Sequence, residues 1–202
     1  MHLLPGFLIA RRREVAALGF CAALGFGATT PAMAGDWTPE SPASSPGLIY
    51  ELKLGALYHD TPGLWSGFSL EKPAVDTNLE IDFHPFYSNG ASTILPVVGG
   101  TLNPDGQTSH AYADVHWRIQ PGTAWYVNFG IGAAYNNGVI GPTEVDRKAL
   151  GSHLLFHPTA ELGLMLDAHN DISIYFEHMS NANTQRYNEG MDDIGLRYGY
   201  RF

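Results

Sequence analysis

Apolar and polar residues alternate along most of the chain from residue 48 onward. In "LIYELKLGALYH", Leu52 and Leu54 fall on one side of an extended backbone, whereas Glu51 and Lys53 fall on the other. A period of two is the signature of a β-strand whose two faces meet different surroundings. The pattern recurs often enough to predict eight strands. We expect them at about 48–59, 75–84, 93–102, 111–120, 125–133, 156–166, 172–180 and 192–202.

The segments between these strands alternate in length. The longer ones are expected at about 60–74, 103–109, 134–149 and 181–191, and the shorter ones at about 85–91, 120–123 and 167–171. Long loops at one end and short turns at the other are typical of outer-membrane barrels, for which eight strands is the smallest usual number. The predicted fold is therefore all-β: an eight-stranded antiparallel transmembrane β-barrel of the outer membrane.

A soluble barrel or sandwich with the apolar face as its core would show the same alternation. Residues 1–34 favour the membrane version, because a run of three arginines precedes an apolar segment at 15–28 and the small residues "AMA". These are the parts of a cleavable signal peptide, and the apolar run is too short to span a bilayer as a helix. We expect a signal peptide at 1–34, a Pro/Ser-rich flexible lead-in at 35–47 and the barrel domain at 48–202.

The ending of the chain also favours the membrane version. Tyr198, Tyr200 and the terminal Phe202 alternate, and this ending resembles the signal that the barrel insertion machinery reads in outer-membrane proteins. The predicted location is the outer membrane of a Gram-negative cell, where outer-membrane lipid would surround the barrel.

Composition and charge limit the possible partners of the protein and the means by which it is stabilised. The full chain has a formal net charge of −9, and without residues 1–34 it would be −11, which makes nucleic acid a poor partner. Cys21 is the one cysteine and lies in the expected leader, so disulfides cannot stabilise the remainder. The charged residues of the predicted strands, acidic and basic, fall mainly on the polar face. Inside a narrow barrel they can pair with one another, which favours a plugged lumen over a pore.

The stretch "FEHMSN" carries the candidate chemistry. His178 and Ser180 are two residues apart, so both share the aliphatic, lipid-directed face of their strand. Asp192 has the aliphatic parity of the last strand, whereas its neighbour Asp193 has the lumen parity. Serine, histidine and an acid together suit nucleophilic acyl transfer. The alternative is that three ordinary polar residues mark the point where two strands leave the membrane.

A resemblance sharpens this hypothesis. The segments "GSHLLFHPTAELGL", "HMSNAN", "NEGMDD" and "IGLRYGYRF" resemble the lipid A 3-O-deacylase (PagL) family, most clearly over 150–202. The family's H-x-S-N motif matches His178, Ser180 and Asn181, which implies a base, a nucleophile and an oxyanion-side residue. Its acid is usually Glu in an "N-x-G-x-E" setting, and this chain has Asp192 in that place. Asn188 matches a family asparagine that would help to hold the loop.

The resemblance implies an outer-membrane esterase that hydrolyses the ester-linked acyl chain at position 3 of lipid A, with its active site facing the outer leaflet. Ser180 would attack, His178 would act as base and Asp192 would orient His178. The backbone near Asn181 and Ala182 would stabilise the oxyanion. A non-catalytic adhesin or structural barrel, and a phospholipase or acyltransferase using the same residues, remain alternatives. No cofactor is expected, and a homodimer is possible.

Two further groups of residues could bind a ligand. Lys72, Arg147, Lys148 and Arg186 fall in the predicted long loops, where they would contact lipopolysaccharide phosphates or be solvated loop charges. His153 and His157 are four apart, a spacing that suits a metal on a helix. They precede Pro158 in a strand-like run, so no metal site is predicted.

Overall fold

The computed structural model describes residues 47–68 and 71–202. The expected signal peptide, and all but the last residue of the expected lead-in, lie outside these residues. No helix in the described part of the chain is long and apolar enough to cross a membrane.

Ten strands make up the described structure. They are β1 (Ile49–Tyr58), β2 (Val75–Phe83), β3 (Tyr87–Asn89), β4 (Ser92–Leu102), β5 (His110–Ile119), β6 (Trp125–Asn136), β7 (Leu154–Phe156), β8 (Thr159–Met165), β9 (Asn170–Met179) and β10 (Met191–Arg201).

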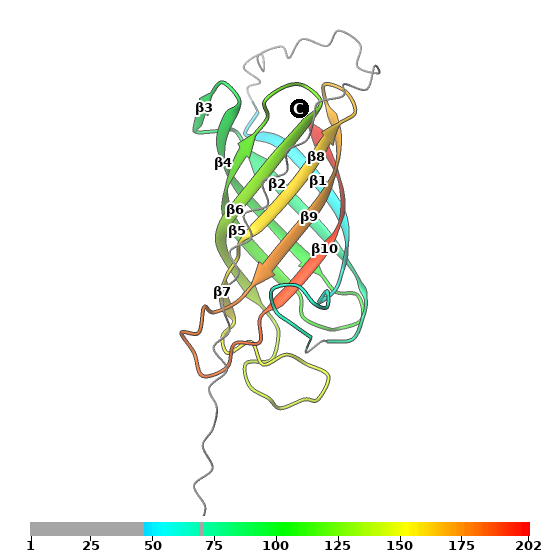
Figure 1. The fold of residues 1–202 in the computed structure, drawn as a ribbon, viewed down its shortest axis with the longest axis vertical. Helices are drawn as coiled ribbons and strands as arrows, with labels where there is room; N and C mark the ends of the chain where they lie inside the picture. The colour runs from blue at the N-terminus through cyan, green and yellow to red at the C-terminus, as the bar shows by residue number, and fades with distance from the viewer. Residues whose placement is uncertain (1–46, 69–70) are drawn as a thin grey trace, which may run out of the picture. The chain divides into compact units, whose positions relative to one another are not determined.

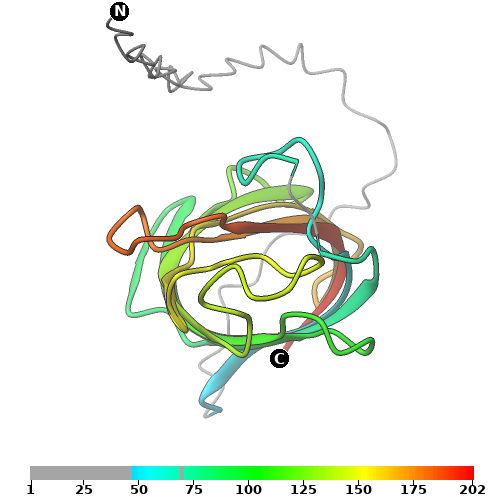
Figure 2. The same ribbon diagram turned by 90° about the horizontal axis from the view of Figure 1, so that it is seen from below.

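Antiparallel pairing runs around a closed wall in the order β2-β1-β10-β9-β8-β6-β5-β4, and a β2–β4 pairing closes it. The strands tilt across the barrel in Figure 1 and form a ring in Figure 2. The short β7 pairs with β6 and leads into β8, so the two together occupy one of eight positions in the wall. The predicted eight-stranded antiparallel barrel is confirmed.

Two local details differ from the sequence prediction. The segment expected as one strand at 156–166 is interrupted at His157 and Pro158, because proline has no N–H to donate to a ladder. The short β3 falls within a segment expected as a turn, and it pairs only with β4. Pro96 is tolerated within β4 because the ladder with β2 begins one residue later, at Val97.

The two faces of the wall decide between the membrane and soluble versions. Leu52 and Leu54 on β1 are 38% and 57% exposed, whereas Glu51 and Lys53, which alternate with them, are fully buried. Most large apolar side chains of the strands therefore face outward and the charged ones fill the lumen, as alternation in a membrane barrel requires. A soluble barrel would have the reverse arrangement.

The ends of the barrel are unequal. The C-terminus and the start of β1 lie at the same end, which we call the termini end, because Glu51 pairs with Arg201. Long connections at 103–109, 137–153 and 180–190, together with the described residues 59–68 and 71–74, lie at the opposite end, the loop end. In Figure 2 the loop that follows β6 (yellow-green) folds across the barrel mouth.

Candidate active site

The site is built on the last two strands, at the loop end. In the β9–β10 ladder His178 lies directly opposite Asp192. Partners in an antiparallel pair project from the same face with Cβ atoms roughly 5 Å apart, so a short side chain on one strand reaches the ring on the other. Ser180 follows at the end of β9, where it forms an isolated bridge with Phe156.

The three predicted side chains are brought together in a hydrogen-bonded row. His178 Nδ1 lies 2.6 Å from Asp192 Oδ1, and His178 Nε2 lies 2.9 Å from Ser180 Oγ. Asp192 is fully buried and His178 is 4% exposed, whereas Ser180 is half-buried. The charged end of the row is thus shielded from water and the hydroxyl end is accessible. Asp192, although one methylene shorter than the family's usual Glu, reaches the imidazole without distortion of the ladder.

The neighbouring acid has a separate role. Asp193 is buried in the lumen, where its Oδ1 accepts the backbone N–H of Asp60 at 2.7 Å and lies 4.0 Å from His59 Nδ1. The parity argument for Asp192 over Asp193 thus agrees with the positions of both side chains.

The loop after β1 contacts Asp192 and His178 through residues 61–66, for which the sequence predicts no role. The backbone N–H of Ser66 donates to Asp192 Oδ2 at 2.5 Å, and Thr61 N–H donates to the Asp192 carbonyl at 2.6 Å. The Trp65 ring stacks on His178 with centroids 4.4 Å apart and planes 15° apart. A tryptophan between glycines in a predicted polar loop ("GLWSG") was the available signal, but nothing in the local sequence connects it with β9.

Lys148 ties this loop to the barrel. The residue is 1% exposed, and its ammonium group donates to Asp60 Oδ1 at 2.7 Å and to Ser66 Oγ at 3.0 Å. The burial and pairing of this charge do not favour the predicted contact of Lys148 with substrate phosphates. Instead it holds Ser66, whose N–H holds Asp192.

Glu71 anchors the same loop from its other side. Its carboxylate accepts N–H groups from Thr108 at 3.0 Å and Lys148 at 3.1 Å, and lies 3.3 Å from His59 Nε2. Burial alone would raise the pKa of Glu71, but hydrogen bonds from His59 and these backbone groups outweigh it and lower the pKa to about 2. The carboxylate is therefore ionised throughout the neutral range.

The other three basic residues predicted to contact phosphates differ in how exposed they are to a molecule outside the barrel. Arg147 is half-buried and its Nε donates to Glu71 at 3.3 Å. Lys72 is exposed and pairs with Asp146 at 2.7 Å, and this pairing raises the pKa of Lys72. Arg186 is exposed and lies over the Tyr187 ring, 5.4 Å from its centroid. Arg186 and Lys72 are thus the two that can reach a molecule outside the barrel.

The predicted oxyanion-side residues divide into two kinds. The Asn181 amide donates to the carbonyls of Leu150 at 2.8 Å and Tyr187 at 2.6 Å, and its backbone N–H donates to Asn188 Oδ1 at 2.9 Å. These bonds occupy the N–H groups of Asn181, so it supports the loop and has none left for an oxyanion. Ala182, two residues after Ser180, has a φ of 51° and is exposed.

The glycine in "NEGMD" is Gly190, and its backbone and its surroundings both require a residue without a side chain. Its φ is 64°, a conformation that L side chains rarely adopt. A Cβ at this position would also lie 3.2 Å from His178 Cε1 and 3.2 Å from the Met179 carbonyl. A larger residue would therefore press on the imidazole.

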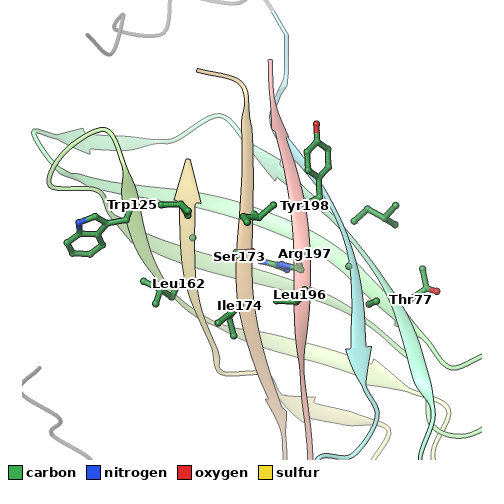
Figure 3. Close-up of a pocket in the computed structure, with 14 residues that line it drawn as sticks. Thr77, Trp125, Leu162, Ser173, Ile174, Leu196, Arg197 and Tyr198 are labelled. Carbon is green, nitrogen blue, oxygen red and sulfur yellow. The ribbon is translucent and has the colours of Figure 1, made fainter. Parts of the chain in front are cut away.

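An apolar depression lies on the outer wall, along the same strands and toward the termini end (Figure 3). It spans β1, β2, β6, β8, β9 and β10, and its β9 residues Ile172 and Ile174 share the face of His178 and Ser180. A hydrocarbon chain whose head is at Ser180 could thus extend along an apolar surface.

The barrel is closed, with an aliphatic exterior and a charged interior, and it carries a hydrogen-bonded Ser-His-Asp row on its outer wall. These features define the class of outer-membrane barrel enzymes. The model of the family "Lipid A 3-O-deacylase (PagL)" matches residues 40–201. The chain belongs to this family.

Individual relatives agree with this assignment. The chain is 30% identical over 154 residues to the lipid A deacylase PagL of Bordetella bronchiseptica, covering 72% of this chain and 74% of that protein. The crystal structure of the outer membrane enzyme PagL superposes with a TM-score of 0.55 at 19% identity, covering 74% of this chain and 99% of that one. The second comparison supports the fold alone.

Proposed function

We propose that this protein hydrolyses the ester that joins an acyl chain to position 3 of lipid A. The observation that carries the proposal is the row Ser180–His178–Asp192 on the outer wall, with hydrogen-bond distances of 2.9 and 2.6 Å. Family membership supplies the substrate class. The active site would face the outer leaflet, where the long loops of such barrels emerge.

The proposed reaction is ester hydrolysis in two steps, carried out by Ser180, His178 and Asp192. With its proton on Nδ1 and held by Asp192, neutral His178 presents the Nε2 lone pair to the Ser180 hydroxyl. Ser180 Oγ attacks the ester carbonyl as its proton passes to Nε2, and the imidazolium then protonates the departing sugar oxygen. In the second half-reaction His178 takes a proton from water as the water oxygen adds to the carbonyl carbon of the acyl-enzyme. The bond from that carbon to Ser180 Oγ then breaks, the fatty acid leaves, and His178 returns the proton to the serine.

Stabilisation of the oxyanion is assigned to groups next to Ser180. Asn188 is half-buried, and its amide nitrogen lies 3.2 Å from Asn183 Oδ1, a single contact that leaves a second N–H for a substrate. The backbone N–H of Ala182 in the left-handed turn is the other candidate. Removal of one oxyanion donor typically costs about 10²–10³-fold in rate.

The substrate's other parts fit the surroundings. The acyl chain would lie along the apolar depression, and exposed Arg186 and Lys72 would meet the phosphate groups of lipid A. Tyr198, Tyr200 and Phe202 at the chain's end would be read by the barrel insertion machinery during assembly.

Refolded variants assayed on lipid A by mass spectrometry provide the test. Ser180→Ala and His178→Ala should abolish release of the acyl chain, and Asp192→Asn should lower the rate by about 10⁴-fold, as loss of the orienting acid does in serine hydrolases. Asp193→Asn is the matched control and should retain activity.

The outcomes separate the alternatives. Activity in Asp192→Asn together with inactivity in Asp193→Asn would refute the assigned acid. A folded parent that is inactive on lipid A but deacylates a phospholipid would make the protein a phospholipase, and inactivity on both would favour a non-catalytic barrel.

A further inference from the structure

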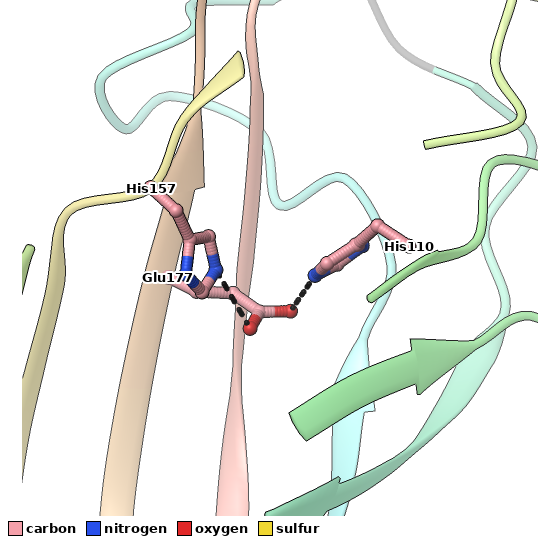
Figure 4. A group of neighbouring side chains, drawn as sticks. All are labelled: His110, His157 and Glu177. Atoms are coloured by element: carbon pink, nitrogen blue, oxygen red, sulfur yellow. Dashed lines mark hydrogen bonds and ion pairs between the residues drawn. The ribbon is translucent and has the colours of Figure 1, made fainter. Parts of the chain in front are cut away.

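Three buried side chains converge in the lumen immediately behind the candidate active site (Figure 4). His110 begins β5, His157 lies between β7 and β8, and Glu177 precedes His178 on β9. His110 Nε2 lies 3.2 Å from Glu177 Oε1, and His157 Nε2 lies 3.3 Å from Glu177 Oε2. The three residues are at most 6% exposed.

The second ring nitrogen of His157 is held from outside this group. Its Nδ1 lies 2.8 Å from Asp114 Oδ2. A carboxylate that accepts a hydrogen bond from Nδ1–H favours the tautomer with a lone pair on Nε2. This is the usual arrangement around a histidine that binds a metal. With Nε2 facing a carboxylate oxygen at 3.3 Å, the space between the two atoms can hold either a second ring proton or a metal cation.

His110 supplies an independent indication. Among the described residues its Nδ1 has no hydrogen-bond partner, and its Nε2 faces only Glu177, at 3.2 Å and outside hydrogen-bond geometry, although the residue is 6% exposed. A buried ring nitrogen without a partner is costly, so it calls for a specific explanation. A metal ion that accepts its lone pair is one.

The spacing of the ligand atoms fits a small divalent cation. The candidate ligand atoms of His110, His157 and Glu177 all lie within 4.8 Å of one another. Two ligand atoms at zinc distances in a tetrahedral site are separated by about 3.3 Å. The observed separations of 3.2 and 3.3 Å match this value.

Two other buried groups have the residue types of a metal site but suit a zinc-type ion less well. Glu80 and Asp82, which lie beside His116, are already neutralised by Lys53, within 3.0 and 3.2 Å. The second group, His59 with Asp76 and Asp193, offers a single imidazole, whereas the group of His110, His157 and Glu177 offers two.

We propose that His110, His157 and Glu177 bind one divalent cation of the zinc type in the lumen. Two imidazoles and one carboxylate leave a fourth position for water, as in open zinc sites. The ion would link β5, the β7–β8 connection and β9. Because Glu177 is adjacent to His178 and His157 is adjacent to Phe156, the bridge partner of Ser180, the ion would brace the wall behind the candidate active site.

Metal binding by the refolded chain, prepared without a histidine tag and treated with chelator, tests the proposal apart from activity. Calorimetry with Zn²⁺ should give one site per chain, and Co²⁺ should give the visible absorption of a four-coordinate ion. His110→Ala and Glu177→Gln should each weaken Zn²⁺ affinity about tenfold or more. Heat-modifiable gel migration checks that each variant is folded.

His153→Ala is the matched control, because His153 is exposed and its Nδ1 contacts the Asn136 carbonyl instead of this group. Its affinity for Zn²⁺ should equal that of the parent. Glu177→Gln preserves side-chain size, so it decides the matter if His110→Ala does not refold. The proposal is overturned if the parent takes up no stoichiometric Zn²⁺, if Glu177→Gln binds as tightly as the parent, or if His153→Ala loses affinity equally.

Discussion

The two halves of the lumen neutralise their buried carboxylates by different means. Toward the termini end the counter-ions are the permanent cations Lys53, Arg118, Arg197 and Arg201. They face Glu51, Glu80, Asp82, Glu161 and Asp171. Toward the loop end the strand carboxylates Asp76, Asp114 and Glu177 face histidines instead, namely His59, His110 and His157.

The difference corresponds to the tasks of the two halves. Guanidinium and ammonium groups keep their charge at all working pH values, so the termini half is held by permanent ion pairs. Imidazoles can lose a proton or bind a metal, and the loop half lies directly behind the candidate active site. The strand carboxylates of the termini half are thus neutralised by fixed charges, whereas those of the loop half, behind the candidate active site, face adjustable ones.

The largest effect is expected from breaking the termini half. Arg197 pairs with Glu80 at 2.9 Å and Glu161 at 2.6 Å, and its guanidinium lies 3.5 Å from the Tyr175 ring centroid. Arg197→Met leaves two buried carboxylates short of a cation and should lower the free energy of unfolding by about 3–5 kcal/mol. Urea unfolding in detergent measures this, with the exposed Arg186→Met expected to stay within about 0.5 kcal/mol of the parent. Equal stability of the two variants would refute the role given to fixed charges.

A smaller and more local effect is expected for Lys148, which binds the supporting loop to the loop half. Lys148→Met leaves Asp60 without its cation and frees Ser66, so the N–H that holds Asp192 is no longer fixed. We expect lipid A deacylation to fall about 10²-fold, the usual cost of misplacing a catalytic group by 1 Å. Lys72→Met, at an exposed pair, should lower the rate far less, because it leaves the N–H that holds Asp192 in place.

Acid should loosen the loop half through Glu71. Its pKa is about 2 in the folded protein against an ordinary 4.5, so its stabilising contribution is complete above about pH 4.5 and is lost as pH falls toward 2. Hydrogen exchange of the 59–74 loop should rise over that range in the parent. In Glu71→Gln it should be raised already at neutral pH, with no further rise from this group. Glu144→Gln, at an exposed loop residue, should behave as the parent does. A parent loop that stays protected to pH 2 would contradict the prediction.

The smallest effect is expected for the stack on the imidazole. Trp65→Ala removes an aromatic contact worth about 0.5–1.5 kcal/mol, which corresponds to a loss of up to about tenfold in deacylation rate. Phe68→Ala in the same loop is the control, because Phe68 is 83% exposed. A Phe68→Ala variant that loses as much as Trp65→Ala would show that the loop acts through its apolar surface and not through the ring on His178.

The sequence indicated the strands and their faces because the two-residue period is a local property. It placed His178 and Ser180 together on one face and separated Asp192 from Asp193, since parity needs only the position of each residue within its own strand. It did not show that β7 and β8 are separate, because the interruption at Pro158 spans only two residues of an otherwise regular alternation.

What sequence alone determined about this protein is therefore the barrel, its strand number and the common face of His178, Ser180 and Asp192. Tertiary structure alone decided which residues surround them. Ser66 and Asp192 are 126 positions apart, Lys148 and Asp60 are 88 apart, and Lys53 and Glu161 in the lumen are 108 apart. Such pairs depend on the closure of the ring and on how the long loops fold back over it. Alternation along one strand contains no information about either, so the buried role of Lys148 and the stack of Trp65 on His178 emerge only once the strands are assembled.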